Sequence, residues 1–163
     1  MENTFADYIL NRRVGLAEIG LTRQEIARRL GGPVDWVGKP PVIGFAILNP
    51  DDSQNWIYYG GGCGVHFDGT NHVDSLLIYP EHVDNGKYPF KGWPVRAGYT
   101  MGDFRKYLIE QGIPFEEKWN GKDTACSIIA AGHCCCRGNR YGRGGRVLFP
   151  DEQDMIFIEN GPV

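Results

Sequence analysis

The sequence contains no long hydrophobic run. None of its apolar stretches approaches the roughly 20 residues that a membrane-spanning helix needs. Residues 1–4 contain neither the basic region nor the apolar core of a secretory signal. We therefore expect a cytoplasmic protein that has no membrane partner.

Basic residues are missing from the middle of the chain. No Lys or Arg occurs between residues 40 and 86, where the acidic residues are Asp51, Asp52, Asp68, Asp74, Glu81 and Asp84. Between residues 124 and 149 the acidic residues are missing instead, and the basic residues are Arg137, Arg140, Arg143 and Arg146. The net charge of −3 is too small to indicate a partner, but its uneven distribution favours one of opposite local sign. The alternative is two solvated faces that balance each other.

The cysteines form no pattern typical of disulfides or of a metal site. Their number, five, is odd, and no secretory signal accompanies them, which argues against a disulfide framework. Three of them, Cys134, Cys135 and Cys136, follow His133 directly. Adjacent ligands on an extended chain point to opposite sides, whereas structural zinc sites use pairs separated by about two to four residues. We therefore expect no metal and no cofactor, and we interpret these cysteines as small, alternately buried residues of a strand.

A nucleophilic cysteine would need a base such as histidine beside it. Cys63 could meet His66, and Cys126 could meet His133, but nothing in the sequence selects either pair. The sequence therefore predicts no catalytic set.

Two kinds of segment resemble parts of nucleotide-binding or nucleic-acid-binding proteins in composition. Residues 60–64 and 142–145 are glycine-rich like phosphate-binding loops, but such a loop opens a helix, and these lead into predicted strands. The arginines between residues 137 and 146, together with Tyr141, could grip nucleic acid by charge and stacking. Because the chain is acidic overall and shows no known nucleic-acid module, we expect hairpin turns and no direct nucleic-acid partner.

Capping residues and hydrophobic periodicity predict three helices, at residues 4–14, 23–30 and 101–111. Runs of β-favouring residues predict strands. The predicted strands are residues 42–48, 56–59, 64–67, 73–79, 126–131, 146–149 and 155–159, and the run that begins at residue 126 could continue to residue 136.

The second and third predicted helices repeat one pattern at an offset of 78 positions. The matching residues are Thr22, Glu25, Ile26 and Leu30 in the first copy and Thr100, Asp103, Phe104 and Leu108 in the second. Residues 59–67 likewise resemble residues 141–149, and a strand-like run follows each. We therefore predict an α+β fold that is a tandem repeat, with helices packed on one face of an antiparallel sheet.

The predicted boundaries follow from this repeat. A first unit of two helices and four strands spans residues 1–80, a connector spans residues 81–97, and a second unit spans residues 98–163, all in one globule. The prolines between residues 80 and 94 forbid a copy of the first helix there, so the second unit is expected to lack it.

The chain carries more aromatic residues on strands and loops than a core of this size needs. Trp36 and Trp119, each just after a helix, are expected to fill the seam between helix and sheet. Tyr58 and Tyr59 are consecutive in a predicted strand, so they are expected on opposite faces. Binding energy at protein interfaces concentrates in Tyr, Trp and Arg. The predicted partner-binding residues are Trp56, Tyr58, Tyr59, His66, Asp68, Asp74, Trp93, Tyr141 and Arg143.

The stretch from Gly20 to Pro33, followed by aromatic strands, resembles the superfold of β-lactamase inhibitor proteins and outer-membrane-assembly lipoproteins. The resemblance implies two helices against a four-stranded antiparallel sheet, and for the inhibitor branch two such units that bind a target with the concave sheet face and inter-strand loops. Cytoplasmic bacterial proteins of this general appearance often resemble immunity proteins that neutralise a toxin.

This chain departs from that pattern in three ways. It has no signal sequence or lipobox, its second unit lacks the first helix, and residues 126–146 have no counterpart in the superfold. The resemblance therefore carries over no individual interface residue.

These observations predict a non-enzymatic binding protein. The function we expect is that of an immunity protein, an antitoxin-like inhibitor whose acidic segment from Asp51 to Asp84 meets a basic patch on a cognate toxin, as a toxin acting on nucleic acid would present. One alternative is a small enzyme or ligand-binding domain that uses Cys126, His133 and Tyr141. Another is a structural or assembly adaptor.

Overall fold

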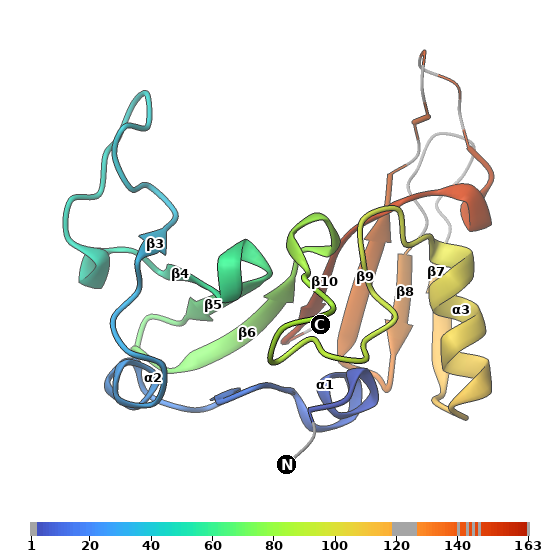
Figure 1. Ribbon diagram of the computed structural model, residues 1–163, viewed down its shortest axis with the longest axis horizontal. Helices are drawn as coiled ribbons and strands as arrows, with labels where there is room; N and C mark the ends of the chain where they lie inside the picture. The colour runs from blue at the N-terminus through green and yellow to red at the C-terminus, as the bar shows by residue number, and fades with distance from the viewer. Residues whose placement is uncertain are drawn as a thin grey trace.

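The computed structural model describes residues 3–118, 127–139, 141–142, 144, 146 and 148–162 of the chain (Figure 1). The α-helices in these residues are α1 (Phe5–Asn11), α2 (Arg23–Leu30) and α3 (Met101–Glu110). The strands are β1 (Arg13–Val14), β2 (Ala17–Glu18), β3 (Asp35–Trp36), β4 (Asn55–Tyr58), β5 (Cys63–Phe67), β6 (Val73–Ile78), β7 (Phe115–Lys118), β8 (Ser127–Ala130), β9 (Cys134–Gly138) and β10 (Met155–Asn160). Short 3-10 helices are η1 (Pro50–Asp52), η2 (Tyr59–Gly61), η3 (Pro80–His82) and η5 (Pro150–Glu152). The predicted α+β class is confirmed, and no helix within the described residues has the length and apolar character to cross a membrane.

Eight strands form one antiparallel sheet, in the order β3-β4-β5-β6-β10-β9-β8-β7. The chain enters at the β3 edge and moves strand by strand to the centre at β6. It then crosses through the connector and α3 to the β7 edge, and returns strand by strand to the centre at β10 (Figure 1). The sheet is therefore continuous, and the β6–β10 pair joins its two halves.

The β6–β10 pairing is symmetric about one residue pair. The facing pairs are Leu76–Asn160, Leu77–Glu159 and Ile78–Ile158. Because the two strands are antiparallel, a half-turn about the Leu77–Glu159 pair exchanges Leu76 with Ile158. Each residue of β6 in this stretch is thus exchanged with the residue of β10 that lies 82 positions later in the sequence.

All three helices begin in the same way. In each, a threonine hydroxyl accepts a hydrogen bond from the third residue's backbone N–H, and the carboxylate of that residue accepts one from the threonine's N–H. The pairs are Thr4–Asp7, Thr22–Glu25 and Thr100–Asp103. The backbone hydrogen bond from Thr4 lowers the pKa of Asp7, and that from Thr22 lowers the pKa of Glu25. The predicted starts of all three helices are confirmed.

The first helix ends earlier than predicted. Arg12 adopts a left-handed conformation (φ 55°) and closes α1, so the helix does not continue to residue 14. The following residues instead form the β1–β2 hairpin, in which Val14 pairs with Ala17 and both are buried. The prediction failed because apolar spacing alone does not locate a left-handed residue.

Two strand predictions are wrong, and a third is correct only in part. Residues 42–48 form a mostly exposed loop, because no strand of the sheet pairs with them within the described residues. The strand predicted at residues 126–131 is present as β8, but it does not continue to residue 136, because Ala131 takes a positive φ of 51° and turns the chain from β8 into β9. Residues 146, 148 and 149 lie outside any strand, and β9, rather than residues 141–149, occupies the position beside β10 that β5 occupies beside β6.

Alternate strand residues on one face enter a core that includes side chains from all three helices. Trp56, Val65, Leu76, Ile158 and Cys136 belong to this core and are at most 2% exposed. The Asn160 side-chain amide donates to the carbonyl of Tyr8 in α1, the sulfur of Cys136 lies 3.9 Å from that of Met101 in α3, and the guanidinium of Arg23 in α2 lies over the ring of Trp56. The connector contributes Phe90, Trp93 and Val95 to the same core.

Tyr8 ties α1 to the junction between the two halves of the sheet. Its fully buried hydroxyl lies 2.9 Å from the carbonyl oxygen of Leu76 and 2.8 Å from that of Ile158, and it shares its proton between them. These two carbonyls are the ones that the half-turn about Leu77–Glu159 exchanges. One side chain therefore contacts both central strands at equivalent positions.

We predict that Tyr8→Phe destabilises the protein by about 1–3 kcal/mol, because two buried carbonyls lose a donor while the ring remains. The measurement is the free energy of unfolding from urea titration. Tyr88→Phe is the matched control, since Tyr88 is exposed, and it should change stability by less than about 0.5 kcal/mol. Equal effects for the two variants would contradict the role given to Tyr8.

Candidate functional site

The second face of the sheet carries a row of residues that crosses all eight strands. We call this the outer face. Its members face one another in register and alternate with the core residues named above. The row is Asp35, Ile57, Gly64, Leu77, Glu159, Cys135, Ile129 and Glu116. It has a carboxylate at each exposed end, one at its centre, and apolar or small residues between them.

A loop stands beside the β3 end of this face (Figure 1). We call residues 37–49 the apolar arm. Ile43 is fully exposed, Phe45 is 98% exposed and Leu48 is 80% exposed. No ionisable residue occurs from residue 40 to residue 50. An apolar group of this kind on the surface is typical of an interaction site.

The base of the arm is held firmly although its tip is not covered. The indole N–H of Trp36 donates to the carbonyl of Ile47 at 2.8 Å, and the backbone N–H of Ile47 donates to the carbonyl of Gly38 at 2.7 Å. Gly38 is required here, because its φ is 95° and a Cβ would lie 2.8 Å from the Ile47 side chain. The Ser53 hydroxyl also donates to the carbonyl of Val37. The prediction that Trp36 fills a helix–sheet seam is therefore replaced by a role in fixing the arm.

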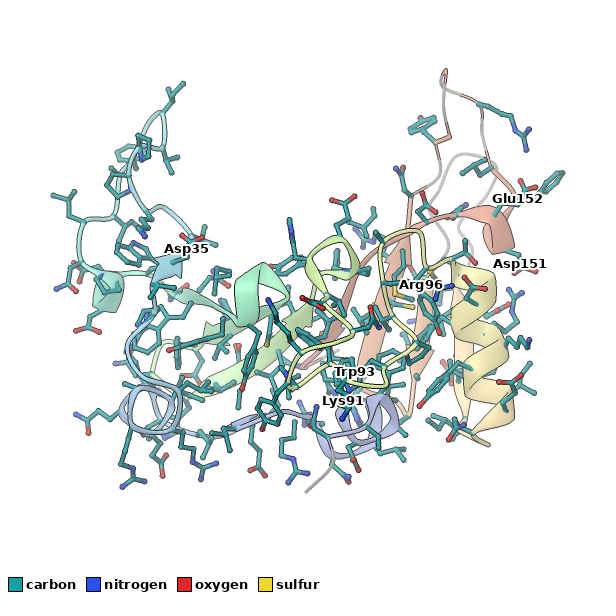
Figure 2. The ribbon with its side chains drawn as sticks, in the orientation of Figure 1. Asp35, Lys91, Trp93, Arg96, Asp151 and Glu152 are labelled. Atoms are coloured by element: carbon teal, nitrogen blue, oxygen red, sulfur yellow. The ribbon has the colours of Figure 1, made fainter. Side chains whose placement is uncertain are left out.

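Exposed apolar side chains also occur after β9, in the segment that leads into the central strand β10 and at its start. Phe149 is largely exposed, and Tyr141 and Ile156 are about half exposed. Figure 2 labels Asp35 at the β3 end and Asp151 and Glu152 at the opposite end. Arg143, which the sequence placed in the site, lies outside the described residues, as do Trp119 and Cys126.

Two predicted site residues are core residues. Trp56 is 2% exposed and donates its indole N–H to the carbonyl of Pro50, and Trp93 is 3% exposed and donates to the carbonyl of Asn3. Figure 2 shows Trp93 on the connector, next to α1. Because neither side chain can reach a partner, we remove both from the proposed contact surface.

Tyr58 and Tyr59 do not lie on opposite faces as expected. The strand ends at Tyr58, and Tyr59 turns into η2 with a positive φ of 55°. The Tyr58 hydroxyl donates to the carbonyl of Gly31, and the Tyr59 hydroxyl accepts from the N–H of Leu16. Alternation along a strand no longer applies once the strand has ended.

These two tyrosines and Tyr79 line a cleft of about 630 Å³, which we call the tyrosine cleft. It opens where the residues after α2 pass the end of β4. Burial raises the pKa of Tyr58 to about 12 and also raises the pKa values of Tyr59 and Tyr79, so all three rings stay neutral. The lining residues are Leu30, Gly32, Val34, Asp35, Ile57, Tyr58, Tyr59, Gly60, Gly61, Tyr79 and His82.

His66, Asp74 and Asp68 occupy the turn and strand ends beside this row. His66 is half-buried while Val65 and Phe67 are fully buried, as alternating side chains of a strand require. Its Nδ1 lies 2.5 Å from a carboxylate oxygen of Asp74. The Asp68 carboxylate accepts hydrogen bonds from the backbone N–H groups at residues 70 and 72, and the bond from residue 72 is the main cause of its lowered pKa. Both acids therefore already have a structural partner.

The cysteines are poorly suited to chemistry. Burial raises the pKa of Cys63 to about 12 and raises the pKa values of Cys134 and Cys135. The Nε2 of His133 lies 2.7 Å from the carbonyl oxygen of Ile9, so the ring is oriented toward α1. In the described residues no three His, Cys, Asp or Glu side chains gather as a metal site would require.

A second cleft, of about 500 Å³, lies around Arg23 at the start of α2. The guanidinium lies 4.2 Å from the ring centre of Phe67, donates to the carbonyl of Ser53 at 2.8 Å and donates to the side-chain oxygen of Asn71 at 3.0 Å. Its hydrogen bonds fix the segments before β4 and β6, so we interpret Arg23 as structural.

Sequence reasoning missed the apolar arm, Asp35 and Tyr79. A run of β-branched and aromatic residues resembles a buried strand wherever it occurs. The proline pair at residues 40 and 41 and the absence of charged residues from residue 40 to residue 50 were the signals that could have indicated a loop. Asp35 could not be found, because strand β3 has only two residues and no pattern.

Comparison with protein-family models, with curated proteins and with solved structures found no match.

We predict that Cys63 and Cys134 resist iodoacetamide at pH 8 in the folded protein, because burial keeps both thiols protonated and covered. Both should react at least about 100-fold faster in guanidinium chloride, where their pKa values return to about 8.5. Peptide mass spectrometry measures the rates. Fast labelling of either thiol in the native protein would show that it is accessible and activated.

Proposed function

We propose that this protein is an immunity protein that binds a cognate bacterial toxin enzyme and blocks it through the outer face of its sheet and the loops at both ends. The observation that carries the proposal is the apolar arm, whose base is fixed by hydrogen bonds and whose tip presents Ile43 and Phe45 without cover. Exposed apolar side chains of this kind do not stabilise the free protein. In a complex that buries them, they contribute to the binding free energy.

Rough energetics support a dominant role for the arm. Burying one large apolar side chain is worth about 1.5–3 kcal/mol. Ile43, Phe45 and Leu48 together could therefore supply a substantial part of a tight complex. Because the base of the arm is already ordered, binding would lose less conformational entropy than a disordered loop would.

Charge would govern how fast the partner is found. Asp51 and Asp52 lie at the base of the arm, both exposed, and Asp35 lies on the adjacent strand. A basic partner surface, such as that of a toxin acting on nucleic acid, would be drawn to this end of the molecule. Asp68 and Asp74 contribute to the same field, but their hydrogen bonds make them poor positions for a charge-reversal test.

The alternative of an enzyme in the second half has less support. Of its three residues, Cys126 lies outside the described residues, the His133 ring contacts the backbone of α1, and Tyr141 is half exposed on a different segment. An adaptor role would use the same surface, so the identity of the partner separates it from a toxin inhibitor.

We further propose that the two halves are diverged copies of one unit, with helices packed on one face of the sheet. Matching backbone hydrogen bonds support this. Val73 donates to Leu21 and Met155 to Tyr99, at 2.8 and 2.9 Å, and Arg23 donates to Asn71 and Met101 to Gln153, both at 2.9 Å. Isolated bridges join Thr22 to His72 and Thr100 to Asp154. The offsets of 78 and 82 positions recur throughout, and the second equals the offset across the β6–β10 pair.

The direct test is to look for a toxin gene next to the gene of this protein and to measure rescue of bacteria from that toxin. We expect the wild type to restore growth and to bind the purified toxin. Ile43→Ser combined with Phe45→Ser should weaken the dissociation constant by about 100-fold or more and abolish rescue, because the arm loses its apolar contacts.

Ile109→Ser is the matched control, because Ile109 is an exposed apolar residue on α3. It should bind and rescue like the wild type. Failure of the wild type to bind the toxin would contradict the proposed function. Full rescue by the double variant would contradict the role of the arm.

Association kinetics test the electrostatic part. Asp52→Lys should slow association with the toxin by about fivefold at low salt, and the difference should fade at high salt. Glu110→Lys on α3 is the control and should have a smaller effect. Equal effects at both positions would show that only net charge matters.

A further inference from the structure

The residues that line the tyrosine cleft determine which chemical group of a partner fits there. The cleft lies at the same end of the molecule as the apolar arm and Asp35, beyond the point where β3 stops pairing with β4. Its volume of about 630 Å³ falls within the usual range of about 300–1,000 Å³ for small-ligand sites. It can therefore enclose one long side chain together with part of the backbone that carries it.

The hydroxyl groups of Tyr58 and Tyr59 are already engaged, and all three tyrosines line the cleft. The hydroxyl of Tyr58 is engaged with the carbonyl of Gly31 at 3.0 Å, and that of Tyr59 with the N–H of Leu16 at 3.4 Å. The ring of Tyr79 packs beside Gly64, where an added Cβ would lie 3.2 Å from two of its atoms. The faces of neutral aromatic rings carry negative electrostatic potential, which attracts Lys and Arg.

Like the faces of the aromatic rings, the charged group in the lining of the cleft is negative. Asp35 contributes a carboxylate to the cleft, and no Lys or Arg lines it. The lining residues from Ile57 to His82 belong to the stretch between residues 40 and 86 that contains no Lys or Arg at all. An anionic ligand would meet repulsion from the Asp35 carboxylate, whereas a cationic one would be attracted to it.

We propose that the tyrosine cleft receives the Arg or Lys side chain of a protein partner, with the cation between the tyrosine rings and the Asp35 carboxylate. This inference rests on the proposed function, since it names the group that the bound protein would insert beside the arm. It assigns a role to Tyr79 and a specific contact to Asp35.

The test is a titration of the full-length ¹⁵N-labelled protein with N-acetyl-arginine amide, followed by NMR. N-acetyl-citrulline amide, which has the same shape without the charge, is the matched probe, and N-acetyl-lysine amide tests whether any cation suffices. The arginine and lysine probes should shift the backbone amide signals of Asp35, Gly60 and Gly61. The citrulline probe should bind at least about fivefold more weakly, as the loss of a cation–π contact of about 1 kcal/mol predicts.

Two variants sharpen the result. Asp35→Asn keeps the hydrogen bond that the side chain accepts from the Trp36 N–H and should weaken binding of the arginine probe by about fivefold or more. Glu116→Gln removes the exposed acid at the opposite end of the same row and should leave it unchanged. Equal binding of citrulline and arginine, shifts away from the cleft, or no shifts at all would overturn the inference.

The same variants separate this inference from the proposed function. If the toxin binds the wild type and Asp35→Asn binds it equally well, the cleft inference fails while the immunity function stands. If the arginine probe binds the cleft but no toxin binds the protein, the proposed function fails while the cation preference of the cleft stands.

Discussion

The pairing of β6 with β10 is the constraint on which the rest of the structure depends. These strands come from opposite halves of the chain, yet they lie side by side at the centre of the sheet, in register about Leu77 and Glu159. The hydroxyl of Tyr8 contacts a backbone carbonyl on each of the two strands, so one side chain of α1 links the helix to both. Loss of this junction would separate two four-stranded sheets, each with an uncovered edge.

A continuous sheet gives the protein one broad outer face instead of two small ones. Core residues occupy the opposite side, where side chains of all three helices and of the connector meet. The outer face is left with apolar residues, carboxylates and the apolar arm beside its β3 edge (Figure 1). The apolar arm, the acidic residues Asp35, Asp51 and Asp52 and the tyrosine cleft thus lie at one end of the molecule, and this arrangement motivates the proposal of a protein-binding function.

The sequence predicts what depends on local interactions and fails where distant ones decide. Helix starts were predictable, because each capping box lies within four residues. The central strands were predictable from alternation. The apolar arm was not, because only the absence of a pairing strand distinguishes it from a core strand. Trp56 and Trp93 could not be assigned to the core, since exposure depends on packing between segments far apart in the chain. Likewise, nothing local indicates that Asp35, Tyr58 and Tyr79 share a cleft.

The measurement that most directly tests the account is hydrogen exchange of the protein alone and in complex with the proposed toxin partner. The account predicts that binding slows exchange in the apolar arm and in η2, next to the tyrosine cleft, and leaves α1 and α3 unchanged. Protection confined to the helices, or spread evenly over the chain, would contradict it.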